Sequence, residues 1–234
     1  MLFRSKYMEV KIVVKFRPLE QLITNYGKQP SNSNDFKLET EPGIHLYGDY
    51  IYLDRDERRR FADENHEYLV SLVQHQEFTL DPANPVPLDL KSVFHPVKEL
   101  IFTVQPEHSA STGKGCCNFG SAGDTELFTS ARILINGVSR GGIMDTDYLR
   151  LVQNMNHHTN IPSSNIYTYS FAFLPETITH STGTTNFTKL SKKTLELQFS
   201  ENQKKNGKLK VKVFAPHFNV LRITHGMGGL VYQC

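Results

Sequence analysis

The sequence predicts an all-β protein in which short strands build a two-sheet sandwich or barrel. About ten short segments alternate between apolar and polar residues at regular spacing, and few segments have a helical period. The clearest strand is Ile166–Leu174, where Tyr167, Tyr169, Phe171 and Phe173 share one face. Such a row of aromatic rings is typical of a core wall that faces a second sheet. We therefore expect at least the two phenylalanines to be buried.

Composition narrows the class of protein further. The 234 residues are 38% hydrophobic and 21% charged, which suits one domain, or one and a fraction, with a packed core. A formal net charge of +2 argues against an extended nucleic-acid-binding surface. No run reaches the ~18 apolar residues that a membrane helix needs, and the first residues lack the apolar stretch of a secretory signal.

The cysteines indicate a reducing compartment. There are three, of which Cys116 and Cys117 are adjacent and Cys234 is terminal. An odd count without C-x-x-C spacing argues against a disulfide framework or a zinc site.

The N-terminal quarter predicts two strands and a helix. Tyr7–Phe16 and Ile44–Leu53 have strand character and flank a polar loop, Asn25–Pro42. Asp54, with Glu57 three residues later, is typical of a helix start. Since two strands are marginally stable alone, we expect residues 1–65 not to be self-sufficient and residues 66–234 to form the main domain.

The rest of the chain supplies enough strands for a complete sandwich. We expect hairpins at Asn136-Gly137 and Asn206-Gly207, loops at Asp81–Pro87 and Pro106–Asp124, and a short helix capped by Asp145. Eight strands in two packed sheets make a jelly roll. The remaining predicted strands are Tyr68–Leu80, Val97–Gln105, Leu127–Ile135, Asn186–Leu190, Thr194–Phe199, Lys208–Phe214 and Phe218–Thr224.

Several motifs, in order along nearly the whole chain, resemble one family. They are GDYIYLDRDERRRFA, HEYLV, HPVKELIFTVQ, LVQNMNHHTNIP, YSFAFLPETITHSTGTTNFTKL and NVLRITHGMGGLVYQC. Together they resemble the double jelly-roll major capsid proteins of nucleocytoplasmic large DNA viruses, of the iridovirus and phycodnavirus type. Two details depart from that pattern: Ser181-Thr182-Gly183 carries one inserted residue, and Lys189 stands where arginine is usual.

The resemblance implies a structural protein. Residues 66–234 would be the C-terminal jelly roll, and residues 1–65 a remnant of the first jelly roll with a linker helix. Three subunits would make a pseudo-hexagonal capsomer in an icosahedral shell. The implied partners are further copies of the chain and minor capsid proteins, with no specific nucleic acid and no membrane insertion. The implied location is the virion capsid, after assembly in the host cytoplasm.

An alternative from another class is a sugar-binding or cupin-like jelly roll. It would be favoured by a bound metal, or by carboxylates and histidines gathered in the mouth of the barrel. The adjacent histidines His157 and His158 are the first candidates, but neighbours on an extended chain point to opposite faces. We therefore expect a pair at the rim of a loop with one ring buried, and no metal held by His157, His158 or His180.

No other motif supports catalysis. Gly113-Lys114-Gly115 lacks the earlier glycine and the following Ser or Thr of a phosphate-binding loop. Cys116 and Cys117 would need a positioned base to act as nucleophiles, and the sequence nominates none. We therefore predict no catalytic, cofactor-binding or metal-binding residues, no cofactor and no enzymatic activity.

Four further features have structural explanations. Arg58-Arg59-Arg60 is typical of a solvated helix face. Asn186-Phe187-Thr188 matches a glycosylation acceptor but belongs to a strand motif. Gly226, Gly228 and Gly229 permit close backbone approach. The lysines of the segment from 204 to 212 are expected on the wet face of an edge hairpin, where they discourage stray pairing: Lys204, Lys205, Lys208, Lys210 and Lys212.

Overall fold

The computed structural model describes residues 11–15, 45–107, 119, 126–205, 207–224 and 227–233. The chain divides into two compact units. One comprises Met1–Glu67 and Arg222–Gly229, and the other comprises Tyr68–Leu221 and Leu230–Cys234. The three cysteines, the Gly113-Lys114-Gly115 triplet, Gly226 and nearly all of the predicted Pro106–Asp124 loop lie outside the described residues.

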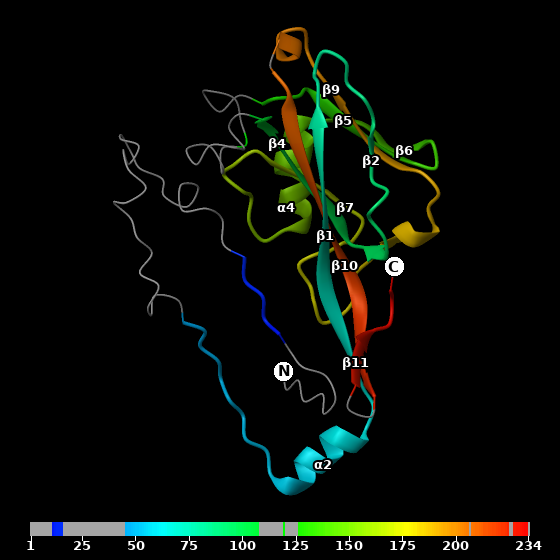
Figure 1. Ribbon diagram of the computed structural model, residues 1–234. Helices are drawn as coiled ribbons and strands as arrows, with labels where there is room; N and C mark the ends of the chain where they lie inside the picture. Colours follow the sequence, from blue (N-terminus) through cyan, green and yellow to red (C-terminus); the bar gives the residue numbers. More distant parts are fainter. Residues whose placement is uncertain are drawn as a thin grey trace, which may run out of the picture. The chain divides into compact units, whose positions relative to one another are not determined.

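The described strands form two antiparallel sheets (Figure 1). The larger sheet has the order β7-β4-β10-β3-β8, and β1 and β11 also pair with β10. The smaller sheet has the order β2-β9-β5-β6. The strands are β1 (His66–Leu80), β2 (Leu88–Asp89), β3 (Pro96–Val97), β4 (Glu99–Pro106), β5 (Ser130–Ile135), β6 (Val138–Asp145), β7 (Ile166–Ser170), β8 (Thr185–Asn186), β9 (Lys193–Gln198), β10 (Leu209–Thr224) and β11 (Met227–Leu230).

In the described part of the chain, one helix precedes β1 and four short helical segments lie between strands. They are α2 (Arg55–Asp63), the π-helix η1 (Tyr148–Val152), α4 (Gln153–His157) and the 3-10 turns η2 (Phe187–Lys189) and η3 (Gln203–Lys205).

Strand β10 shows how alternation builds the core. Leu209, Val211 and Val213 are fully buried, while the intervening Lys210 and Lys212 lie on the other face near Glu77 of β1. Val211 and Val213 are opposite Val104 and Phe102 of β4. Buried residues of both sheets belong to one apolar cluster, so the two sheets pack face to face.

An aromatic group occupies the middle of this core. Tyr167 of β7 is opposite Phe102 of β4, and their ring centroids are 5.5 Å apart. The rings of Phe128 and Tyr167 form an edge-to-face pair with centroids 4.6 Å apart, and all three residues are at most 1% exposed. Such pairs stabilise by about 0.5–1.5 kcal/mol beyond their burial.

The predicted Asn136-Gly137 hairpin is confirmed. β5 and β6 pair across this turn, and both turn residues have positive φ, 52° and 82°. A two-residue turn of this kind matches the twist of antiparallel strands, and asparagine and glycine tolerate its backbone best.

The predicted helix start at Asp54 is also confirmed. The Asp54 carboxylate accepts a hydrogen bond of 2.9 Å from the backbone N–H of Glu57. No residue of α2 is buried, and Arg59 and Arg60 form ion pairs along the helix with Asp63 and Glu64. The arginines therefore lie on a solvated face, as expected.

The prediction of two N-terminal strands is wrong for the residues that the structure describes. Residues 11–15 and 45–53 are in no strand, and nearly all of these residues are exposed. Alternation predicts only which face a strand would bury. The strand itself forms only when a neighbouring strand accepts its backbone hydrogen bonds.

The aromatic strand is shorter than predicted. β7 ends at Ser170, and Phe173 is 70% exposed, so the expectation that both phenylalanines are in the core is wrong. The Ser170 side chain causes the break, because its Oγ donates to Ala172 O and accepts from Ala172 N. The backbone N–H groups of Phe171 and Ala172 then both turn to Lys98 O.

The second predicted hairpin is wrong as well. β9 lies in the smaller sheet and β10 in the larger one, so the segment between them crosses from sheet to sheet. The lysines of β10 therefore lie on an interior strand, not at an edge. The predicted break before Phe218 is absent, because β10 runs continuously from Leu209 to Thr224.

Two local details also differ. Asp145 is the last residue of β6, and the N-cap of the π-helix η1 is Asp147, which makes no side-chain cap hydrogen bond. Asn186–Leu190 is not one strand but the end of β8 followed by η2, since the Asn186 side chain accepts from Thr188 N and turns the chain.

Two residues of the same predicted row test this packing. Tyr167→Ala should lower the free energy of unfolding by about 3–5 kcal/mol, because it removes a fully buried ring. Phe173→Ala should change it by less than about 0.5 kcal/mol, because that ring is exposed. Urea denaturation of the full chain measures both, and equal losses would contradict the bend after Ser170.

Candidate functional site: a buried polar network

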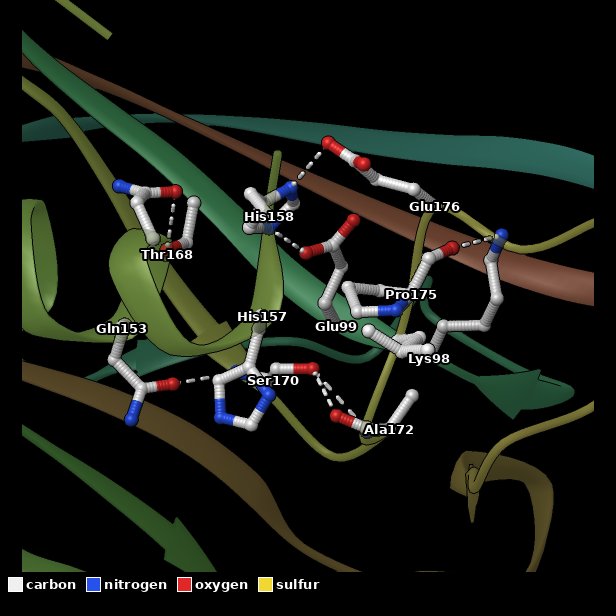
Figure 2. A network of polar contacts seen from close by, with 12 residues as sticks. Lys98, Glu99, Gln153, His157, His158, Thr168, Ser170, Ala172, Pro175 and Glu176 are labelled. Carbon is white, nitrogen blue, oxygen red and sulfur yellow. Dashed lines mark hydrogen bonds and ion pairs between the residues drawn. The ribbon is translucent and has the colours of Figure 1, made fainter. Parts of the chain in front are cut away.

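The structure brings together polar side chains beneath the loop that follows β7. We call residues Phe171–Gly183 the FAF loop, after its first three residues. The side chains beneath it come from the start of β4 and from α4 with the residue that follows it (Figure 2). Lys98 and Glu99 are 4% and 5% exposed, although charged side chains are rarely buried without partners.

Lys98 is tied to the FAF loop through its ammonium group. Its Nζ donates a 2.8 Å hydrogen bond to Pro175 O and lies 4.9 Å from the centre of the Phe218 ring. Burial lowers the pKa of Lys98, and the charge of neighbouring Glu99 opposes that shift.

Glu99 is paired with His158. The Glu99 Oε2 and His158 Nε2 atoms are 2.8 Å apart, and the other ring nitrogen, Nδ1, is 3.3 Å from Oε1 of Glu176 in the FAF loop. Glu176 also accepts hydrogen bonds from the backbone N–H and the hydroxyl of Thr159. Figure 2 shows the imidazole of His158 between the two carboxylates.

The pKa values of this group follow from its contacts. The hydrogen bond to Glu99 raises the pKa of His158 although burial opposes the shift. The hydrogen bonds from Thr159 lower the pKa of Glu176.

The neighbouring His157 has a different partner. Its Nδ1–H donates to Phe173 O at 2.9 Å, so the two histidines do not converge on one point. His180 is exposed, and its Nδ1 is 3.0 Å from the hydroxyl of Thr179. Among the described residues, no three His, Cys, Asp or Glu side chains are arranged to hold a metal ion.

Helix α4 is fixed to β7 by further side chains. Gln153 Oε1 accepts from Ser170 N at 3.1 Å, and the Thr168 hydroxyl donates to Asn154 Oδ1 at 3.0 Å. Both Gln153 and Asn154 are buried, so these bonds satisfy polar groups that have left water.

The FAF loop closes on itself near its end. The Thr182 hydroxyl accepts from Leu174 N and donates to Leu174 O, both at 2.9 Å. Gly183 has φ +139°, and a Cβ there would lie 3.0 Å from Phe171 O. A glycine is therefore required for the two ends of the loop to approach this closely.

A second buried lysine was also missed by sequence reasoning. Lys193 donates from Nζ to Val93 O at 2.9 Å and to Phe187 O at 3.1 Å, and burial lowers its pKa. For Lys98 and Glu99 the signal was two adjacent charges inside an apolar strand, HPVKELIFTVQ. These contacts hold the FAF loop, α4 and the segments around Lys193 in place.

Comparison with known proteins identifies the family. Residues 57–229 match the family model described as large eukaryotic DNA virus major capsid protein. The major capsid protein of Pyramimonas orientalis virus is 36% identical over 99% of this chain, and that of Phaeocystis pouchetii virus is 27% identical over 99%. The chain spans 57% and 62% of the length of these two relatives.

Solved structures agree on the fold. A quasi-atomic model of the PBCV-1 virus capsid superposes with a TM-score of 0.65 at 24% identity, over 79% of this chain and 56% of that chain. The two-sheet sandwich is thus a jelly roll of the viral capsid class. The chain belongs to the family of large eukaryotic DNA virus major capsid proteins, whose named relatives are structural.

None of the helices in the described part of the chain has the length and apolar composition needed to cross a bilayer.

Gly183 provides a direct test of the closed FAF loop. Gly183→Ala should lower the free energy of unfolding by about 1–3 kcal/mol, because the new Cβ meets backbone atoms in a conformation that L residues avoid. Gly207→Ala is the matched control, since a Cβ there meets nothing within 4 Å. Urea midpoints measure both, and a neutral Gly183→Ala would exclude the close approach.

Proposed function

We propose that this chain is a shell-forming subunit whose copies associate as trimeric, pseudo-hexagonal capsomers of an icosahedral capsid. The observation that carries the proposal is the family match over residues 57–229, which includes most of the two sheets. The role is mechanical: the sandwich fixes the loops, and the loops make the contacts between subunits.

The surface of the sandwich unit supports protein–protein contact. Large apolar side chains are exposed at Met155 of α4 and at Phe173 and Ile178 of the FAF loop, with exposed fractions of 75%, 70% and 59%. Exposed apolar groups favour interfaces, and a loop that is already held by hydrogen bonds to the sandwich loses little entropy on docking.

The wider assignments belong to the same proposal. Copies of this chain are the main partner, minor capsid proteins are further partners, and assembly takes place in the host cytoplasm before the chain enters the virion. The chain acts without enzymatic activity.

We also propose that residues 66–234 are the stable C-terminal jelly roll and that residues 1–65 depend on it or on another chain. The exposed apolar side chains of Ile12, Val14 and Tyr52 support this, because such groups need a partner surface.

The assembly state tests the capsomer. The purified 234-residue chain should sediment in analytical ultracentrifugation as a species of three times its 26.7 kDa mass. Double substitution of Met155 and Phe173 by serine serves as a probe of the exposed apolar surface. A wild-type chain that remains monomeric at micromolar concentration would contradict the trimer.

Limited proteolysis tests the domain boundary. A protease should leave a resistant fragment that begins between Asp54 and Tyr68 and extends close to the C-terminus. Mass spectrometry identifies the fragment ends. Equal resistance of the N-terminal and sandwich regions in a monomeric sample would show that both belong to one core.

A further inference from the structure

The contacts of His158 with two carboxylates depend on how many protons its imidazole ring carries. A neutral imidazole carries one N–H, so it donates one hydrogen bond, whereas an imidazolium donates two. Both ring nitrogens of His158 face carboxylate oxygens, at 2.8 Å to Glu99 and 3.3 Å to Glu176. Both contacts are hydrogen bonds at the same time only when His158 is positively charged.

The two sides of this arrangement differ in burial. The Glu99 side chain is 6% exposed and that of Glu176 is 48% exposed. After His158 loses a proton, its single N–H stays with Glu99, because a buried carboxylate without a partner is far more costly than one that water can reach. The lone pair of Nδ1 then faces Glu176, and that contact is lost.

We propose that Glu99, His158 and Glu176 form a pH-sensitive latch, which holds the FAF loop on the sandwich while His158 is charged and loosens it when His158 becomes neutral. The latch joins three elements: β4 through Glu99, the end of α4 through His158, and the FAF loop through Glu176. It is a property of the folded chain and does not depend on capsomer formation.

Charged groups face the ring of His158 from two elements. Glu99 of β4 faces one ring nitrogen, and Glu176 of the FAF loop faces the other. Lys98, the neighbour of Glu99, donates to Pro175 O instead. The neighbouring His157 donates to Phe173 O.

The raised pKa of His158 sets the upper end of the pH range in which the latch is closed. The stabilisation is complete below the unfolded-state value of 6.5 and is lost as pH rises through the higher folded-state pKa. The lowered pKa of Glu176 means that its contribution is lost only in acid, below 4.5. The latch is therefore closed in mildly acidic solution and opens toward alkaline pH.

Opening would change the surface that the chain presents. The FAF loop carries the exposed Phe173 and Ile178, so its mobility sets how rigidly these apolar side chains are displayed. The two hydrogen bonds between the Thr182 hydroxyl and the backbone of Leu174 do not titrate, since all of these groups are neutral, and they still close the far end of the loop. We therefore expect loosening at the Glu176 end and not loss of the fold.

Hydrogen exchange followed by NMR tests the latch in the full chain. The protection factor of the Thr159 amide, which donates to Glu176, should fall about threefold between pH 6 and pH 9 after correction for intrinsic exchange, as for a half-exposed ion pair. The amide of Phe102 in the core of β4 should not change. A pH-independent Thr159 amide in the wild-type chain would overturn the proposal.

Variants separate the latch from general effects of pH. His158→Gln should have low protection of Thr159 at both pH values, and Glu176→Gln, on the more exposed side, should lower the pKa of His158 measured from its ring proton shifts. His180→Gln is the matched control, because His180 is exposed in the same loop, and it should keep the wild-type pH dependence. If His158→Gln misfolds, an unchanged His158 pKa in Glu176→Gln would still exclude the latch.

Discussion

The structure depends on the burial of β4 together with two charges at its start. Further along, Phe102 and Val104 are fully buried between β7 and β10, which requires the whole strand to lie inside the larger sheet. Lys98 and Glu99 are carried into the interior with it. A buried charge without a partner costs several kcal/mol, so a hydrogen-bond acceptor and a donor must reach these two side chains. Pro175 O and His158 fill these roles and so determine the path of the FAF loop.

This arrangement links the core to the surface of the sandwich unit. The same loop segment that satisfies Lys98 from inside displays Phe173 and Ile178 to solvent. A subunit of a shell must present its contact groups in nearly the same geometry in every copy, since small errors accumulate over a closed lattice. Polar anchors beneath an apolar loop meet that need, and they also make the loop sensitive to protonation.

The sequence predicted the features that depend on local patterns. The apolar strand Val97–Gln105 located β4, alternation located the first half of β10, Asn136-Gly137 predicted the hairpin, and Asp54 with Glu57 predicted the start of α2. The predictions of the family and of the jelly-roll fold came from several motifs that occur in order along the chain, and comparison with known proteins confirmed both.

The features that the sequence did not predict depend on contacts between distant residues. The end of β7 depends on Ser170 turning back to Ala172 and on Lys98 O, which lies 73 residues before Phe171. The partition of β9 and β10 into different sheets depends on the strands that pair with each of them, which a turn motif alone cannot specify. The polar network was hidden for the same reason, because His158 and Glu99 are 59 residues apart.

A major capsid protein must be present in the viral particle itself. Quantitative mass spectrometry of purified particles of the virus that encodes this chain measures its presence there. Peptides from residues 57–229 should be among the most abundant in the particle, as the family match requires. Their presence in infected-cell extract but absence from purified particles would show that the chain is not a component of the shell.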